Sequence, residues 1–219
     1  MRLRSLAVVV AVATASLLAP LSGTSSAAGR CSVVTPTKVV VDQLYREVPV
    51  RLSSNCATAG RTYALWNVVH AKGITDFLEF EDNTTDVIGV SWPGRYTVQP
   101  VYAWDAQEVS LEQNTAYVIA KCGSRLTATT SRAGAQLTFD ANARFWSSSF
   151  NEWQQRAGAN VSLMHRAPGA TDWTWVTYAT TDRAGRVHLS IAPRSGSYRL
   201  MIKETDQIWA SYSAAVAVG

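Results

Sequence analysis

The sequence has few of the side chains on which most enzymes and metalloproteins depend. Its 219 residues include three histidines and three cysteines. No Cys-x-x-Cys spacing occurs and no histidine neighbours a cysteine, so a metal site is not expected. No G-x-S-x-G turn exposes a nucleophilic serine that His70, His165 or His188 would activate, and we expect His165 and His188 to lie on the surface. We therefore predict no catalytic residues, no enzymatic activity and no cofactor.

Charge is also scarce, and neither sign dominates. Charged residues make up 16% of the chain, with 20 Lys and Arg against 16 Asp and Glu. Two of the basic residues, Arg2 and Arg4, belong to the N-terminal leader described next, so the rest is closer to neutral. Proteins that bind nucleic acids or anionic membranes carry clustered basic residues. We therefore expect no nucleic-acid partner.

Long apolar runs are missing beyond residues 1–28. This segment begins with basic residues, continues with the apolar stretch Leu6–Leu18 and ends with the small residues Ser26-Ala27-Ala28. That pattern predicts a signal peptide cleaved after Ala28. A retained membrane anchor is the alternative, but the run is shorter than the roughly 20 residues that a bilayer span needs. Without a later hydrophobic tail, we expect a secreted, extracellular product that does not insert into the membrane.

What the sequence does contain is an alternation of apolar and polar residues. In Arg186–Ile191 and again in Tyr198–Lys203, every second residue is apolar. A period of two with one apolar face is typical of antiparallel strands in a half-buried sheet. Several such strands, separated by turns that contain glycine, predict an all-β sandwich architecture.

Two segments share this plan, which predicts two tandem domains. We place them at residues 31–122 and 125–219, after the signal peptide. Gly94-Arg95-Tyr96 and Gly196-Ser197-Tyr198 each precede a long strand near the end of a segment. A tyrosine at that place is typical of the tyrosine corner of immunoglobulin-like sandwiches, and Trp66 lies where such domains bury a tryptophan. The expected fold is two tandem immunoglobulin-like antiparallel β-sandwiches.

Short motifs add a resemblance to a known group of proteins. In the second half they are V-S-L-M-H-R at 161–166, W-x-x-V at 173–176, T-T-D-R-A-G at 180–185, Y-R at 198–199 and E-T-D-Q-I-W at 204–209. In the first half they are L-W-N-V-V-H at 65–70 and P-G-R-Y-T-V at 93–98. With these motifs the chain resembles exported actinobacterial proteins with tandem immunoglobulin-like domains, a family of unknown function. The resemblance implies the fold and brings no catalytic residues.

The cysteines predict one disulfide. Lys38–Asp42 and Glu47–Leu52 are interpreted as the strands of one hairpin with its turn near Gln43-Leu44. Cys31 and Cys56 are equally distant from that turn, so antiparallel pairing would bring them together. We predict the pair Cys31–Cys56, with the two pairings that involve Cys122 as alternatives. The remaining cysteine is then a buried small hydrophobe or a reactive thiol.

Four aromatic residues are the candidate binding site for a ligand or partner. Phe145, Trp146, Phe150 and Trp153 lie in FWSSSFNEWQQR, which is interpreted as a long polar connection between two strands. Exposed aromatic rings bind sugars or anchor protein partners. The alternative is that this segment folds over the edge of its own sandwich or packs on the first domain.

An acidic stretch gives a second, weaker candidate site. Asp76, Glu79, Glu81, Asp82 and Asp86 fit either a calcium site or a solvated sheet edge. We predict a secreted, non-enzymatic protein that acts in extracellular binding or as a structural surface module, with an unknown protein or polysaccharide partner. The alternative function is a carbohydrate- or calcium-binding accessory module.

Overall fold

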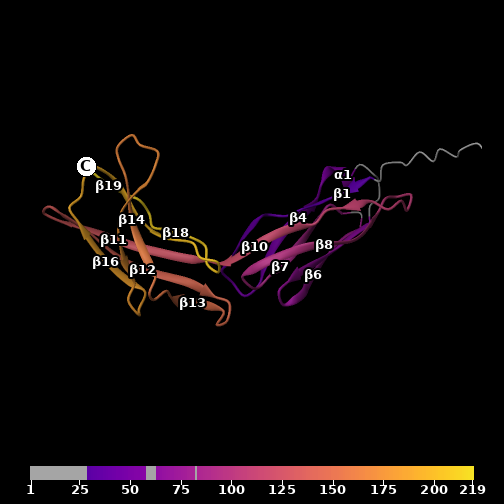
Figure 1. Cartoon of the computed structure of the whole chain (residues 1–219), viewed down its shortest axis with the longest axis horizontal. Coiled ribbons are helices and arrows are strands. Elements are labelled where there is room, and N and C mark those ends of the chain that lie inside the picture. Colours follow the sequence, from indigo (N-terminus) through magenta and orange to yellow (C-terminus); the bar gives the residue numbers. More distant parts are fainter. Residues whose placement is uncertain (1–28, 58–62, 82) are drawn as a thin grey trace, which may run out of the picture.

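The computed structural model describes residues 29–57, 63–81 and 83–219, and the predicted signal peptide lies outside them. The described residues form 19 strands and one short helix, α1 (Ser54–Ala57). Among them no helix has the length and apolarity to span a membrane. Two β-sandwiches lie end to end along the long axis of the molecule (Figure 1).

The first sandwich is built from a five-stranded and a three-stranded sheet. The larger sheet has the order β3 (Lys38–Val41), β10 (Ala116–Cys122), β8 (Gly94–Trp104), β5 (Tyr63–His70), β6 (Gly73–Glu81). The smaller sheet has the order β2 (Val33–Val34), β4 (Arg46–Leu52), β7 (Thr85–Val90). A separate short pair joins β1 (Arg30–Cys31) to β9 (Glu112–Gln113).

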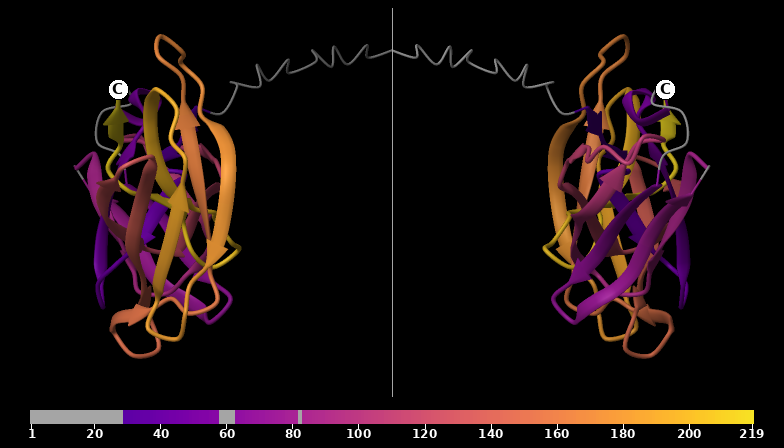
Figure 2. Two further views of the ribbon diagram at one scale, coloured as in Figure 1. Left: turned by 90° about the vertical axis from the view of Figure 1, so that its left-hand side faces the viewer. Right: turned by 90° about the vertical axis from the view of Figure 1, so that its right-hand side faces the viewer.

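The second sandwich repeats the two-layer plan, and Figure 2 views the molecule along its long axis with the two sandwiches one in front of the other. One sheet contains β11 (Ser124–Ala133), β12 (Gln136–Ser147), β13 (Glu152–Gln155) and β16 (Arg186–Ile191). The other contains β15 (Thr174–Thr180), β14 (Asn160–Arg166), β17 (Gly196–Ile202), β18 (Ser211–Tyr212) and β19 (Val216–Val218). All the pairings within this sandwich are antiparallel.

Each sandwich has its own apolar core. In the first, Trp66 is fully buried, meets Phe80 edge to face at 5.8 Å and donates from Nε1 to the Asn114 carbonyl oxygen at 2.9 Å. In the second, Phe139 and Tyr198 lie at the centre with a ring separation of 6.2 Å. The alternation predicted from the sequence places these side chains between the sheets, and the all-β immunoglobulin-like fold is confirmed.

Both tyrosine corners are present. The Tyr96 hydroxyl donates to the Trp92 carbonyl oxygen at 3.0 Å and accepts from the Trp92 N–H at 3.2 Å. The Tyr198 hydroxyl donates to the Arg194 carbonyl oxygen at 3.1 Å and accepts from the Arg194 N–H at 2.9 Å. Each tyrosine therefore fixes the loop before its strand by two bonds to the residue four positions earlier.

The predicted disulfide Cys31–Cys56 is confirmed, with a Cα–Cα distance of 4.5 Å. The hairpin from which it was predicted is wrong. β3 crosses to the larger sheet and pairs in parallel with β10, whereas β4 lies in the smaller sheet. The cysteines meet because β2 pairs antiparallel with β4, with Val33 opposite Leu52. Between β2 and β4, the chain leaves the smaller sheet, adds β3 to the larger sheet and then returns to the smaller sheet.

Candidate functional site

The predicted aromatic site is a β-hairpin, not a long polar connection. β12 extends through Trp146 to Ser147, and β13 begins at Glu152. Trp146 pairs directly with Trp153 across the hairpin, and their rings meet edge to face at 6.0 Å. Asn151 completes the tight turn with a φ of 55°.

The four predicted residues differ in burial. Trp146 is 8% exposed and belongs to the core of the first sandwich, against which Trp153 also packs. Phe145 is half-buried, and Phe150 is 71% exposed at the turn. The structure thus brings the two tryptophans together between the sandwiches and leaves Phe150 apart in solvent, while ligand binding by the four residues stays a prediction.

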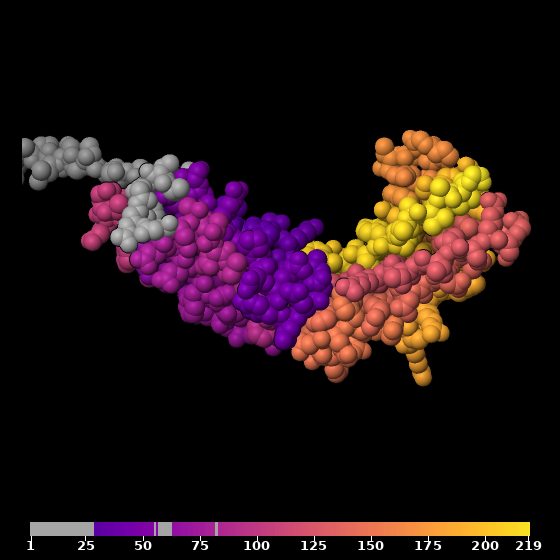
Figure 3. All heavy atoms as spheres, turned by 180° about the vertical axis from the view of Figure 1, so that it is seen from behind, coloured from indigo at the N-terminus to yellow at the C-terminus, as the bar shows by residue number. Residues whose placement is uncertain are grey.

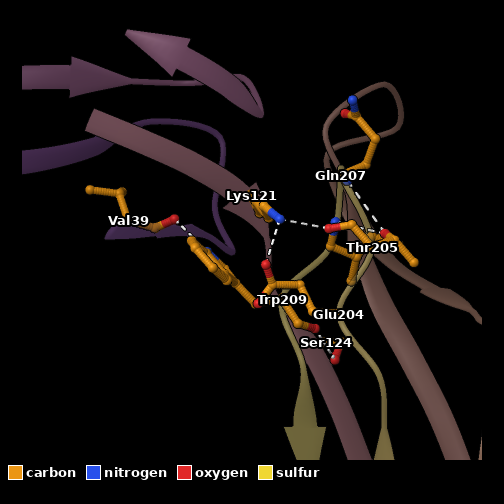
Figure 4. Close-up of polar contacts among 8 residues, drawn as sticks. Val39, Lys121, Ser124, Glu204, Thr205, Gln207 and Trp209 are labelled. Carbon is orange, nitrogen blue, oxygen red and sulfur yellow. Dashed lines mark hydrogen bonds and ion pairs between the residues drawn. The ribbon is translucent and has the colours of Figure 1, made fainter. Parts of the chain in front are cut away.

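A loop of the second sandwich lies against the same end of the first one. We call residues 203–210, which connect β17 to β18, the junction loop. Within it, Trp209 Nε1 donates to the Val39 carbonyl oxygen at 2.7 Å (Figure 4). The Trp209 N–H donates to the Cys122 carbonyl oxygen at 3.0 Å, and the Cys122 N–H donates to the Gln207 carbonyl oxygen at 2.8 Å. The loop therefore adds a backbone pair to the end of β10.

Charge reinforces this contact. Lys121 Nζ donates to Glu204 Oε1 and to the Thr205 carbonyl oxygen, each at 2.7 Å (Figure 4). Its side chain is only 13% exposed and lies 4.9 Å from the Trp209 ring, over which Lys38 also lies at 5.2 Å. Charge-assisted bonds shielded from water are stronger than exposed ion pairs. Lys121 therefore holds the junction loop in place.

The link between the sandwiches is the single residue Gly123, and its backbone is held by hydrogen bonds on both sides. The Gly123 N–H donates to the Val41 carbonyl oxygen at 2.8 Å, and its carbonyl oxygen accepts from the Trp146 N–H at 2.9 Å. A Cβ at Gly123 would lie 3.1–3.2 Å from Val40, Asp42 and Trp153. The sandwiches accordingly meet without a visible gap in Figure 3, and we expect them to move as one body.

Cys122 lies inside this junction. It is the free cysteine of the described chain and is 5% exposed. Burial raises the pKa of its thiol. Of the two interpretations left open by the sequence, the structure supports a buried small hydrophobe.

The prediction that His165 lies on the surface is wrong, because its side chain is only 3% exposed. Its ring packs on Tyr198 at 4.7 Å, and its Nε2 is hydrogen-bonded to the Ser195 carbonyl oxygen at 3.0 Å. His70 occupies the same place in the first sandwich, 4.7 Å from the Tyr96 ring. The signal in the sequence was the repeated histidine at the end of L-W-N-V-V-H and near the end of V-S-L-M-H-R.

The histidines also explain two glycines. Gly94 and Gly196 have φ values of 142° and 136°, and a Cβ at either would lie 2.5 Å from the imidazole Nε2 of its domain. Glycine is the residue that tolerates both the dihedral and the close approach. His188, in contrast, is exposed as predicted and pairs with Asp140 at 2.8 Å.

The acidic stretch joins the two sheets of the first sandwich. Asp76 Oδ2 accepts from the Gly89 N–H of β7 at 2.7 Å, and Asp86 Oδ2 accepts from the Glu79 N–H of β6 at 2.9 Å. These carboxylates therefore bridge two strand edges. Asp82 lies outside the described residues, and within those described no group of three or more acidic, His or Cys side chains is arranged to hold a metal ion.

The sequence reasoning missed an exposed surface on the larger sheet of the first sandwich. Its outer side carries Tyr63, Phe77, Tyr102, Trp104 and Tyr117, which we call the aromatic face. The Tyr102 and Trp104 rings stack at 4.6 Å, and Tyr63 lies nearly parallel to both, at 5.6 and 6.2 Å. Phe77 is 58% exposed. The available signal was that these rings occupy the outward positions of alternating strands.

Two polar contacts fix the aromatic face. The Tyr63 hydroxyl donates to Glu79 Oε1 at 2.6 Å, and this bond raises the pKa of Tyr63. The Arg95 guanidinium lies over the Tyr117 ring at 3.9 Å. Rings held in this way lose little side-chain entropy when a partner covers them.

Comparisons with known proteins give only distant similarities. No family model matches the chain, and no curated protein matches its sequence. Among solved structures, the D0–D1 domain of intimin is 13% identical with a TM-score of 0.30, covering 85% of this chain and 95% of its own. Murine CEACAM1b is 14% identical with a TM-score of 0.32, covering 87% and 98%. Three N-terminal domains of the bacteriophage RB49 outer capsid protein Hoc are 14% identical with a TM-score of 0.33, covering 85% and 68%.

Proposed function

We propose that this protein is a secreted, non-enzymatic binding module. In this proposal, residues 1–28 are a cleaved signal peptide, and residues 31–122 and 125–219 are two domains held as one rigid body. The aromatic face of the first domain then presents the contact surface to a protein partner. The exposure of that face is the observation that carries the proposal.

The physical argument starts from the composition of the aromatic face. Tyr63, Tyr102 and Trp104 form a stacked cluster on this face, and exposed apolar clusters on soluble proteins often mark an interaction site. Tyr and Trp are also enriched among the residues that dominate binding energy, because each buries a large area with few rotatable bonds. Phe77, Trp104 and Tyr117 are 58%, 41% and 46% exposed, so they remain available to a partner.

Export is supported by the disulfide as well as by the leader. The Cys31–Cys56 bond ties the strand at the start of the first sandwich to helix α1 after β4. Disulfides persist in oxidising compartments and are rare in the cytosol. The bond therefore supports an extracellular location.

The rigid junction gives the binding proposal its mechanism. A flexible linker would let the domains reorient and would add an entropic cost to any contact that involves both of them. Here the single-residue link at Gly123 and the Lys121–Glu204 ion pair keep the second domain in a fixed position. The aromatic face of the first domain would then keep a fixed distance and angle relative to the second domain.

A polysaccharide partner is the second candidate. The nearly parallel rings of Tyr63, Tyr102 and Trp104 also suit stacking on sugar rings. A calcium-binding role receives less support, because the Asp76 and Asp86 carboxylates are already engaged by backbone N–H groups.

The test uses two variants, each of which removes one exposed aromatic ring. Immobilised protein is incubated with the culture medium and with the cell-surface polysaccharides of the producing cells. We expect Trp104→Ser to abolish retention of the partner and Tyr178→Ser, at a ring 56% exposed on the second domain, to leave it intact. Equal retention by both variants, with unchanged unfolding midpoints, would refute a role for the aromatic face. Retention of polysaccharide alone would select the second candidate.

A further inference from the structure

The second sandwich contains a buried arginine whose guanidinium has no ion-pair partner among the residues that the structure describes. Arg156 follows β13 and is 9% exposed. Its Nη1 is enclosed by the protein and makes no hydrogen bond, and within the described residues its guanidinium forms no ion pair. Its backbone is held in place, because the Arg156 N–H donates to the Ala143 carbonyl oxygen at 2.9 Å and its carbonyl oxygen accepts from Thr181 Oγ1 at 2.6 Å.

Such an arginine is unusual on energetic grounds. Buried charges in proteins are normally paired, because a charge removed from water without a counter-charge is costly. Burial lowers the pKa of Arg156, yet a guanidinium stays protonated in proteins. The side chain therefore holds a positive charge in a largely buried position, with its Nη1 donor unpaired.

Arg156 lines a pocket of about 330 Å³. The other walls are the loop 157–160 and the segment 202–205, which includes the start of the junction loop. The loop wall is fixed, since the Gly158 N–H donates to the Thr181 carbonyl oxygen at 3.1 Å. Arg156 is one of the residues that line this space and keeps 9% of its surface exposed.

The charge of the pocket is positive. Lys203 also lines it, is exposed and has no ion-pair partner in the described chain. Glu204 is the carboxylate in the lining, but its Oε1 is bound by Lys121 at 2.7 Å. Two cations thus remain without a counter-charge, and the neighbouring anion is already neutralised.

We propose that this pocket binds an oxyanion, that is, a carboxylate, phosphate or sulfate group of a small ligand, with Arg156 as the donor and Lys203 as the second cation. A planar guanidinium matches two oxygens of such a group at once, which gives both geometry and strength. The bound anion would supply the missing counter-charge. The pocket is separate from the aromatic face, so either proposal can fail without the other.

The experiment titrates the purified protein with sodium acetate, phosphate and sulfate by calorimetry, against sodium chloride at equal ionic strength. We expect saturable binding of at least one oxyanion and a matching rise in the unfolding midpoint, because the ligand binds the folded state. Arg156→Gln should weaken the affinity at least about tenfold, the effect of losing charge-assisted hydrogen bonds. The salt that saturates at the lowest concentration identifies the group.

Two further variants keep the test decisive. Arg166→Gln is the matched control, because its guanidinium lies over the Trp173 ring at 4.9 Å, outside the pocket lining. Lys203→Gln changes an exposed residue and should weaken binding several-fold even if Arg156→Gln does not fold. In chloride, Arg156→Met should raise the unfolding midpoint, since it removes an unpaired buried charge. Responses equal to that of chloride, or affinity unchanged in Arg156→Gln or Lys203→Gln, would overturn the proposal.

Discussion

Replacing Trp209 by Phe tests whether the junction loop couples the two domains. The substitution keeps a smaller aromatic ring but removes Nε1, which donates to the Val39 carbonyl oxygen at 2.7 Å. The backbone bond from Trp209 to Cys122 does not depend on the side chain and should remain. The change therefore removes one defined link between the second domain and β3 of the first.

The expected loss follows from the contacts. A part-buried hydrogen bond of this kind contributes about 1 kcal/mol. The contacts of the ring with Lys38 at 5.2 Å and Lys121 at 4.9 Å contribute roughly 0.5 kcal/mol each, and Phe retains part of them. The free energy of unfolding should fall by about 1.5 kcal/mol, which for a chain of this length is about 3–6 °C in the midpoint.

Scanning calorimetry and small-angle X-ray scattering together measure both consequences. We expect the wild-type protein to unfold in one transition, and Trp209→Phe to lower the midpoint and broaden or split the transition, because the domains become less coupled. The scattering curve should show a wider range of interdomain angles. Trp175→Phe is the matched control, since that ring is 60% exposed and its loss should change stability by less than about 0.5 kcal/mol. Equal effects of the two substitutions, with one sharp transition in both, would refute the coupling.

Three further outcomes are expected. Tyr96→Phe and Tyr198→Phe should each lower the free energy of unfolding by about 1–3 kcal/mol in urea titrations, because the backbone N–H and carbonyl at each corner lose their partner. Gly196→Ala should destabilise far more than Gly134→Ala, since a Cβ at Gly196 clashes with the Arg166 carbonyl oxygen while Gly134 faces open space; similar unfolding midpoints would contradict this. Burial raises the pKa of Cys122 above the usual value near 8.5, so its contribution to stability is present below that pH and is lost as pH rises further. Urea midpoints of the wild type and Cys122→Ala should therefore converge or cross as the pH rises above about 8.5, and a constant difference would exclude the effect.

Much of the fold could be predicted because its signals are local. Alternation with period two placed Val187 and Leu189 between the sheets, and both are buried. The Gly-x-Tyr pattern predicted two tyrosine corners, because that hydroxyl bonds to backbone only four residues away. The Cys31–Cys56 pair was predicted correctly even though its supporting hairpin was not.

The errors arose where segments far apart in the chain determine the strand pairing or the burial of a side chain. β3 was assigned to a hairpin with β4, but its partner is β10, about 80 residues further along the chain. His165 was assigned to the surface, although Tyr198 and the Ser195 carbonyl oxygen enclose it from another strand and loop. Trp146 and Trp153 resembled a free aromatic loop, yet the first sandwich covers them. In each case the local pattern was compatible with two environments.

The sequence by itself determined most of the segments that become strands, which side of most strands is apolar, and where the tyrosine corners lie. These properties follow from side-chain direction along an extended backbone and from bonds within a few residues. Only the tertiary structure decided what covers each outward side chain. It places Trp146 under the first domain, leaves the aromatic face uncovered, and buries Arg156 without a carboxylate. The reason is physical: burial and charge pairing depend on which surfaces meet, and those surfaces come from residues far apart in the chain.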